Sequence, residues 1–218
     1  MTGTVSSYLP DGSLNITALE SAARILERGG VIIVPTDTVY GLAALMAEPE
    51  AVGRIYHMKG RETAKPLVLQ VAGEETGRSL IVNWDWRWER LTRLFWPGPL
   101  TLVGRRSALV PQVITSGGET VGVRCPREES LLYLLRRLGQ PLAVTSANPT
   151  GAAAAIRADE AAAGLRMPPD LVLDGGASCL QVVSTVLDLS TSRSILLRSG
   201  ALTLAELAAV LGSAGLVT

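Results

Sequence analysis

Two lysines and the single histidine lie together in one short segment of this sequence. Lys59 and Lys65 are the only lysines and His57 is the only histidine, so every other fixed cation is an arginine. A lysine ammonium is a compact, mobile charge, whereas the guanidinium of Arg61 is a planar fork. This mixture suits a polyphosphate, and chance clustering on a solvated loop is the alternative. Lys59 and Arg61 converge only in an extended segment, so we expect both, with Gly60 between them, in a non-helical loop.

A second polar group follows a predicted buried strand at 142–145. Ser146 and Asn148 are also two residues apart, so they share a side in an extended segment. Ligands of open α/β sheets bind beyond the carboxyl ends of strands, which places this pair well for binding. An ordinary turn around the Asn148-Pro149 step is the alternative.

Arg124 ends a further predicted strand. Alternation puts Thr120, Gly122 and Arg124 on one face and the two valines on the other. An arginine beside a gap the size of a glycine favours an anion such as a carboxylate, with a structural salt bridge as the alternative. Arg198 ends another predicted strand in the same way, and Ser184 opens one.

Hydroxyl side chains gather at 35–41, directly after the predicted strand 31–34. Thr36, Thr38 and Tyr40 lie within five residues there, as a turn or a small polar ligand would require.

Several other kinds of site are excluded by the sequence. The sequence has no Walker P-loop, Gly-x-Gly-x-x-Gly or Gly-x-Ser-x-Gly motif, and one histidine cannot form a His-x-x-x-His metal site.

Composition fits one compact domain without a strong overall electrostatic field. The 218 residues are 47% hydrophobic and 18% charged, and the formal net charge is zero. No net field attracts nucleic acid or an anionic membrane, so any anion site must be local. Cys125 and Cys179 suggest neither a disulfide framework nor zinc, and no apolar segment predicts a membrane span. These features predict a cytoplasmic protein without membrane partners.

Helical and strand signals alternate along the chain, which predicts a mixed α/β architecture. Further strands are expected at 67–71, 100–103, 121–124, 171–173, 185–189 and 195–197, and helices at about 51–59, 88–95, 128–138 and 157–165. Thr17 with Glu20 and Thr203 with Glu206 are expected to form capping boxes. The buried stripe of one helix is expected to comprise Trp88, Leu91, Leu94 and Phe95. Trp84, Trp86 and Trp88 favour packing over a base-stacking platform.

A series of short motifs, in this order, resembles the YrdC-like family, the threonylcarbamoyl-AMP synthases. The motifs lie at 35–42, 59–61, 65–67, 97–101, 120–124, 146–148, 184–186 and 197–200. The resemblance implies a twisted mixed sheet with flanking helices and a concave basic groove, in a domain at 15–212 after an N-terminal extension at 1–14. Glu62, Val183 and Ala153-Ala154 depart from the family pattern, and the additional C-terminal domain of longer relatives is expected to be missing.

The resemblance also implies an activity, its site and its partners. The reaction would join L-threonine, bicarbonate and ATP into threonylcarbamoyl-adenylate and pyrophosphate, for modification of transfer RNA. ATP would be bound by Lys59 and Arg61 at the phosphates and by Lys65, Thr120, Ser146, Asn148 and Arg198. Threonine would be bound by Thr38, Tyr40, Arg124 and Ser184. Magnesium would arrive with ATP, without a dedicated metal site, and a downstream transferase would use the product.

The resemblance leaves two other activities open. An RNA-binding module could hold a tRNA or a double-stranded RNA in the same groove, although the neutral net charge argues against it. A carbamoyltransferase could use the same adenylate chemistry on another acceptor.

Overall fold

The computed structural model describes residues 3–60, 65–149, 151–212 and 216–217. Its strands are β1 (Gly3–Ser6), β2 (Ile32–Val34), β3 (Gly41–Leu45), β4 (Val68–Gln70), β5 (Leu100–Arg105), β6 (Thr120–Arg124), β7 (Leu142–Ser146), β8 (Leu171–Asp174), β9 (Thr185–Asp188), β10 (Ser194–Arg198) and β11 (Leu216–Val217). Its helices are α1 (Ile16–Glu27), α2 (Pro49–Lys59), α3 (Glu74–Ser79), α4 (Trp86–Phe95), α5 (Gln112–Thr115), α6 (Glu129–Leu138), α7 (Ala158–Ala162) and α8 (Leu204–Leu211). None of these helices is long and apolar enough to cross a lipid bilayer.

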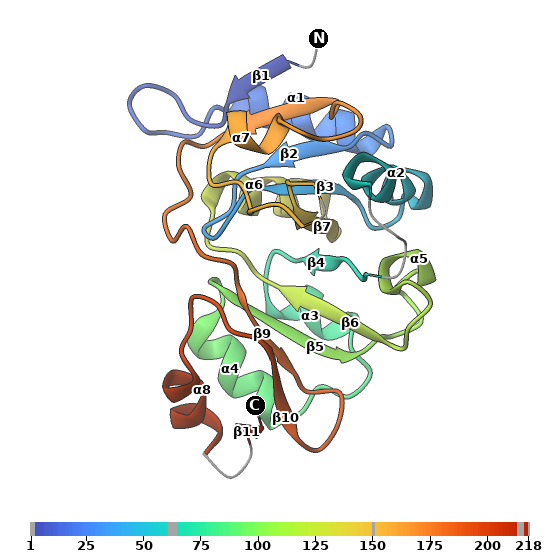
Figure 1. The fold of residues 1–218 in the computed structure, drawn as a ribbon, viewed down its shortest axis with the longest axis vertical. Helices are drawn as coiled ribbons and strands as arrows, with labels where there is room; N and C mark the ends of the chain where they lie inside the picture. Colours follow the sequence, from blue (N-terminus) through green and yellow to red (C-terminus); the bar gives the residue numbers. More distant parts are fainter. Residues whose placement is uncertain (1–2, 61–64, 150, 213–215, 218) are drawn as a thin grey trace.

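The described strands form one mixed sheet in the order β1-β8-β2-β3-β7-β4-β6-β5-β9-β10-β11. Figure 1 shows the sheet extending from β1 at the top to β11 at the bottom. The run β2-β3-β7-β4 is antiparallel, whereas β4 pairs with β6, and β5 with β9, in parallel. Parallel neighbours need crossover connections, so distant parts of the sequence meet side by side. The predicted α/β class with a twisted mixed sheet is confirmed.

Strand alternation divides the core into two clusters of buried side chains. The larger cluster includes Leu69 of β4 and Val123 of β6, packed with residues of α2, α4 and α5. The smaller cluster packs α1 and α6 on the opposite face, against β8, β2, β3 and β7. Neither β4, β5 nor β6 contributes a side chain to this smaller cluster. The second face of these three strands is therefore left for the polar side chains that alternate with the core residues.

Two details of the helices differ from the expectations. Asn15, not Thr17, caps α1: its side chain accepts from the Ala18 amide at 3.2 Å and donates to the Ser6 carbonyl at 3.0 Å. The predicted Thr17 and Glu20 capping box is therefore wrong, because the chain already turns into the helix at Asn15. In contrast, the box of Thr203 and Glu206 at α8 is confirmed.

The predicted buried stripe of α4 is wrong for Leu94, which is 60% exposed, whereas Trp88 and Leu91 are fully buried. At about 100° per residue, Leu94 lies roughly 120° around the helix from Trp88.

At the N-terminus, the segment predicted as an extension contributes β1, which pairs in parallel with β8.

Candidate active site

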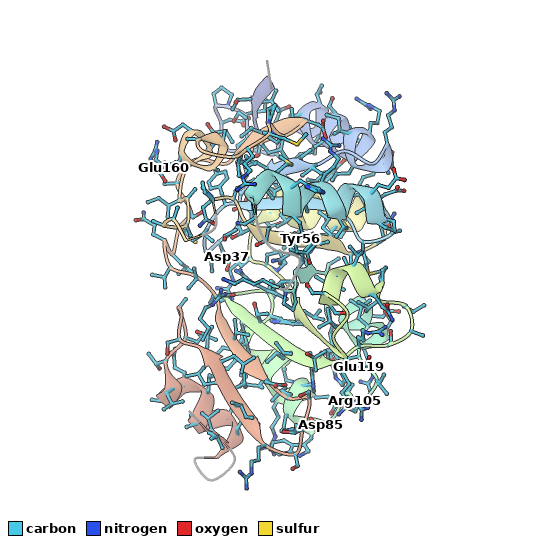
Figure 2. All side chains as sticks on the ribbon, turned by 45° about the vertical axis from the view of Figure 1, so that its right-hand side comes forward. Asp37, Tyr56, Asp85, Arg105, Glu119 and Glu160 are labelled. Carbon is cyan, nitrogen blue, oxygen red and sulfur yellow. The ribbon has the colours of Figure 1, made fainter. Side chains whose placement is uncertain are left out.

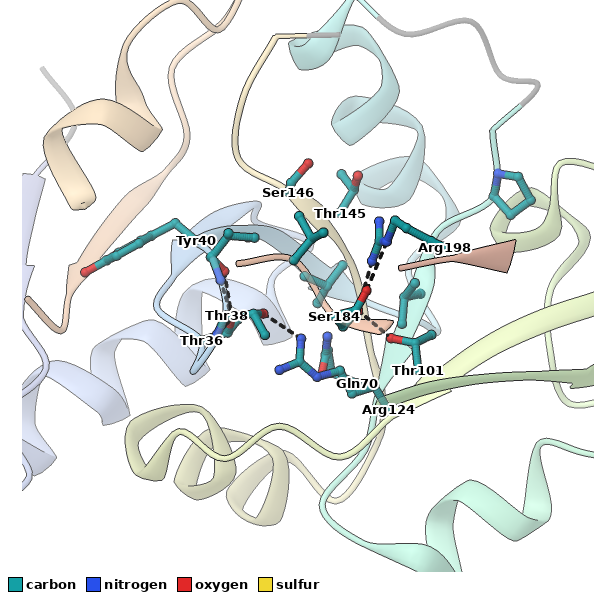
Figure 3. Close-up of a pocket in the computed structure, with 16 residues that line it drawn as sticks. Thr36, Thr38, Tyr40, Gln70, Thr101, Arg124, Thr145, Ser146, Ser184 and Arg198 are labelled. Carbon is teal, nitrogen blue, oxygen red and sulfur yellow. Dashed lines mark hydrogen bonds between the residues drawn. The ribbon is translucent and has the colours of Figure 1, made fainter. Parts of the chain in front are cut away.

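A cavity of about 210 Å³ opens on the same sheet face as α1 and α6, at β4, β6 and β5, which these two helices leave uncovered. Its walls come from the 36–41 turn after β2, from β4, β5 and β6, from the end of β7, and from the segment and strand that carry Ser184 and Arg198. Figure 3 shows these side chains converging from segments far apart in the sequence. Of the residues predicted to bind a ligand, the cavity walls include Thr38, Tyr40, Arg124, Ser146, Ser184 and Arg198.

Arg124 is the most buried cation of the cavity wall, with 3% of its surface exposed. Its Nη2 donates to Asp37 Oδ1 at 2.7 Å, its Nη1 to Thr38 Oγ1 at 2.7 Å, and its Nε to the Gly98 carbonyl at 2.9 Å. Burial lowers the pKa of Arg124, and the charge of Asp37 opposes this shift. Figure 2 places Asp37 near the middle of the molecule. Arg124 therefore forms a salt bridge with Asp37 and also lines the cavity, and its three hydrogen bonds hold the guanidinium in a fixed orientation.

Arg198 reaches the cavity from β10 and is fixed by Ser184. Its Nε donates to the Ser184 carbonyl at 3.0 Å, and its Nη2 to Ser184 Oγ at 2.9 Å. Thr101 Oγ1 lies 2.8 Å from the same hydroxyl. Burial lowers the pKa of Arg198, and the like charge of Arg124 lowers it further. Two guanidinium groups that repel one another across a cavity favour a bound anion.

The turn after β2 supplies hydroxyl groups and buries its acidic residue. Thr36 Oγ1 lies 2.9 Å from Thr38 Oγ1 and donates to the Val39 carbonyl at 2.6 Å. Tyr40 lines the cavity, but its ring points away from Arg124 and Arg198 (Figure 3). Its hydroxyl donates to the Gly176 carbonyl at 2.6 Å and accepts from the Gly175 amide at 3.0 Å. Tyr40 therefore positions the turn and does not present its phenol to a ligand.

Lys59 is a buried helix residue and not part of a loop as expected. It is the last residue of α2, which ends at Gly60 in the left-handed conformation (φ 58°), and it is 5% exposed. Its Nζ donates to the Ser146 carbonyl and, at 3.3 Å, to Asn148 Oδ1. Lys59, Ser146 and Asn148, which the resemblance assigns to ATP, thus lie together, although only Ser146 of the three belongs to the cavity wall.

Asn148 also holds its own turn. Its side-chain Nδ2 donates to the backbone carbonyl groups of Pro149, at 3.1 Å, and Ala152, at 2.7 Å. The turn interpretation of this segment is therefore confirmed, and Asn148 Oδ1 accepts a hydrogen bond from Lys59 Nζ. Ligand binding by Ser146 and Asn148 stays a prediction.

Among the described residues, Lys65 and Thr120 were also predicted to bind a ligand but do not line the cavity. Arg61 lies outside the described residues. Lys65 is exposed, next to Pro66 of the cavity wall. Thr120 lies at the opposite end of β6 from Arg124 and does not line the cavity.

Sequence reasoning missed several residues of the wall, among them Gln70, Thr101 and Thr145. Gln70 and Thr101 occupy alternate positions of strands that were predicted, but the apolar residues around them gave no indication that one face lines a cavity.

Comparisons with known proteins agree on one family. The Sua5/YciO/YrdC family model, described as "Telomere recombination", matches residues 24–200. The threonylcarbamoyl-AMP synthase of Pyrococcus abyssi is 39% identical over 191 residues, which is 88% of this chain and 56% of that protein. The Bacillus subtilis enzyme of the same name is 36% identical, over 92% of this chain and 58% of its own length. The chain thus spans little more than half the length of these two curated relatives.

Solved structures give the same result. The structure of P. abyssi Sua5 complexed with L-threonine superposes with a TM-score of 0.93 at 35% identity, covering 99% of this chain and 62% of that one. Escherichia coli YciO superposes with a TM-score of 0.81 at 25% identity, covering 92% of this chain and 96% of the other.

Proposed function

Because this chain belongs to the Sua5/YciO/YrdC family, we propose that it makes threonylcarbamoyl-adenylate and pyrophosphate from L-threonine, bicarbonate and ATP. Two curated relatives carry the name of this activity, and a similar structure holds L-threonine. The observation that carries the proposal is the Arg124 guanidinium, fixed by three hydrogen bonds at the wall of a cavity that suits a small amino acid.

The amino-acid end of the site is built around Arg124, Thr38 and Ser184. A guanidinium binds a carboxylate through paired, charge-assisted hydrogen bonds, so Arg124 suits the carboxylate of threonine. The hydroxyl groups of Thr38 and Ser184 lie within hydrogen-bonding distance of Arg124 and Arg198, respectively. They supply short polar contacts on either side of that carboxylate.

The nucleotide end of the site combines Arg198 with the cluster of Lys59, Ser146 and Asn148. Lys59 presents its ammonium to this cluster from the end of α2. We assign Lys59 to the phosphates, together with Arg61 and Lys65 in the segment that follows it. Arg198 neutralises phosphate charge from the cavity wall. Magnesium would enter with the triphosphate and neutralise part of its negative charge. Among the described residues, no cluster of three His, Cys, Asp or Glu side chains suggests a separate metal site.

The chemistry needs positioning more than a nucleophilic side chain. The threonine nitrogen bonds to the carbon of bicarbonate with loss of water, which gives a carbamate. An oxygen of this carbamate attacks the α-phosphorus of ATP, and the bond from that phosphorus to pyrophosphate breaks. Fixed cations beside the α-phosphorus and the leaving pyrophosphate stabilise the transition state, an effect that reaches several kcal/mol. We further propose that the product serves a separate transferase acting on tRNA.

Pyrophosphate release tests the proposal directly. The protein with ATP and Mg²⁺ should release pyrophosphate only when both threonine and bicarbonate are present, and mass spectrometry should identify threonylcarbamoyl-adenylate. Release that is equal without threonine would exclude the proposed reaction. Release with carbamoyl phosphate in place of threonine and bicarbonate would indicate a carbamoyltransferase.

A further inference from the structure

Arg166 lies against the end of α2, in the segment between α7 and β8. Its backbone amide donates to the Met58 carbonyl at 2.8 Å. Its guanidinium packs so closely over Gly60, where α2 ends, that a Cβ on this glycine would overlap it. Two residues earlier, a Cβ on Gly164 would come within 3.0 Å of the Pro149 ring. The segment that carries Arg166 therefore contacts both the end of α2 and the turn after β7.

The end of α2 and the turn after β7 also carry the cluster of Lys59, Ser146 and Asn148. Lys59 directly precedes Gly60, and its Nζ donates to the Ser146 carbonyl and to Asn148 Oδ1. Lys59 is buried, whereas Arg166 is exposed and does not line the cavity. A buried ammonium and an exposed guanidinium therefore come from neighbouring positions at the end of one helix.

Arg166 has no counter-charge among the residues that the structure describes. Asp170 is the acidic residue nearest to it along the chain, and it pairs instead with Arg54 at 2.9 Å. The Arg166 guanidinium also donates no hydrogen bond within the described part of the chain. The carbonyl end of α2 attracts a cation, but Lys59 already lies there, and like charges repel. Two neighbouring cations without a carboxylate between them favour a bound anion.

The position of Arg166 outside the cavity wall favours the phosphates that lie farthest from the amino acid. The carbamate oxygen attacks the α-phosphorus at the cavity, where Arg124 would hold the carboxylate of threonine. In-line attack places the leaving pyrophosphate on the opposite side of that phosphorus, so the β- and γ-phosphates extend away from the amino acid. Arg166, beside the Lys59 cluster, is therefore placed for the end of the triphosphate that leaves.

We propose that Arg166 binds the β- and γ-phosphates of ATP and stabilises them as pyrophosphate leaves. This inference rests on the proposed function and adds a cation outside the motifs that identify the family. When the bond from the α-phosphorus to the bridging oxygen breaks, that oxygen keeps the electron pair and gains negative charge. A guanidinium stabilises such a charge through paired hydrogen bonds to phosphate oxygens.

Arg166→Gln tests the contact, because it removes the charge and keeps a polar side chain. In calorimetry with Mg²⁺, we expect the dissociation constant of inorganic pyrophosphate to rise by about 10- to 100-fold, the ratio that one hydrogen bond to a charged group provides. The dissociation constant of AMP should stay unchanged. Arg166→Lys should retain part of the affinity, since the charge remains without the planar fork. Arg93→Gln, at an exposed arginine in the last turn of α4, is the matched control and should change neither constant.

Turnover and melting temperature separate this contact from a structural role of Arg166. We expect the ATP KM of the Arg166→Gln protein to rise and its kcat to fall, while the threonine KM and the melting temperature stay unchanged. An arginine that only stabilises the end of α2 would instead lower the melting temperature and weaken AMP and pyrophosphate binding equally. Such a parallel change, or a pyrophosphate dissociation constant equal to that of the unmodified protein, would overturn the inference.

Pyrophosphate binding measured without turnover distinguishes a failure of this inference from a failure of the proposed function. If the unmodified protein binds pyrophosphate but shows no threonine-dependent release from ATP, the proposed reaction fails, and Arg166 is judged by the ratio of the two dissociation constants. If the unmodified protein turns over and the Arg166→Gln protein binds pyrophosphate equally well, only the role of Arg166 fails. If the unmodified protein binds neither ATP nor pyrophosphate, both proposals fail.

Discussion

At the scale of single residues, the cavity depends on charges that are expensive to bury. Asp37 and Arg124 have side chains that are 2% and 4% exposed and lie 2.7 Å apart. A buried pair of this kind adds little net stability compared with apolar residues, but removal of one partner leaves an uncompensated charge. The pair is therefore best understood as a device that fixes the direction of the Arg124 guanidinium.

Asp37→Asn should show how much stability is lost when Arg124 is left as an uncompensated buried charge. We expect the free energy of unfolding to fall by about 3–5 kcal/mol, because Arg124 stays buried without its counter-charge. Chemical denaturation measures this loss, and the threonine KM should rise in the same variant. Glu20→Gln breaks a partly exposed pair with Arg137 and should cost below about 1 kcal/mol. Equal stability of the two variants would contradict the proposed role of Asp37.

Lys59→Met should affect both turnover and stability. The sequence predicted a loop position for Lys59, where an ammonium adds little to stability, but the side chain is buried. Removal of the ammonium leaves the Ser146 carbonyl and Asn148 Oδ1 without this donor, which costs about 1–3 kcal/mol. Turnover should fall about 100-fold or more if the lysine also stabilises the transferring phosphate. The exposed Lys65→Met is the control for stability, and a Lys59→Met protein with undiminished turnover would remove Lys59 from the site.

The residues themselves revealed part of this arrangement. Alternation in 120–124 correctly placed Arg124 opposite the core valines, since the strand period depends only on local geometry. The partnership of Arg124 with Asp37 was not predictable in this way, because it depends on a contact between residues 87 apart in the sequence. Gln70 was missed for a similar reason: β4 is short and apolar around it, and only the sheet order reveals which of its faces lines the cavity.

At the scale of elements, the end of β10 and the segment before β9 hold each other at the cavity edge. Gly200 packs so closely on this segment that a Cβ there would overlap backbone atoms of Val183, Ser184 and Thr185. The Ala201 amide also donates to the Val183 carbonyl at 3.1 Å. The contact of Arg198 with Ser184 therefore depends on a backbone approach that only a glycine permits.

Gly200→Ala should displace this segment and weaken the cavity wall. Because the overlap is with backbone atoms, we expect a loss of stability of about 1–3 kcal/mol together with lower turnover. Gly53→Ala in α2 is the matched control, since a Cβ there meets no atom within 4 Å. That variant should instead gain about 0.5–1 kcal/mol, the usual effect of replacing a helical glycine. Thermal unfolding compares the two variants, and equal effects would exclude the packing argument.

Elements with strong local signals were predictable, and those defined by pairing were not. The helix at 51–59 was confirmed because apolar residues at helical spacing precede a glycine stop. β3 was not anticipated, because Gly41–Leu45 has no alternation and is buried at every position. The helix expected at 157–165 is α7 and ends already at Ala162, followed closely by Gly164 at φ 78°.

At the scale of the whole molecule, the positive charge of the site is local. The 20 basic and 20 acidic residues cancel, yet Arg124 and Arg198 both line one cavity, on the part of the sheet that α1 and α6 leave uncovered. The strand order produces this concentration, because it brings β4, β6, β5 and β9 together from distant parts of the chain. The resulting field favours one small anion site over an extended track for a nucleic-acid backbone.

Duplex RNA should therefore bind weakly and with little dependence on salt. Each phosphate neutralised by a protein cation contributes about −0.9 to the slope of log K against log salt for a duplex, so six to ten contacts would give a steep slope. With zero net charge, we expect a slope shallower than about −2 in gel-shift titrations from low to physiological salt. Arg124→Ala should leave this slope unchanged, because its guanidinium is buried beside Asp37. A steep slope, combined with pyrophosphate release that does not respond to threonine, would instead establish an RNA-binding module in which the cavity is incidental.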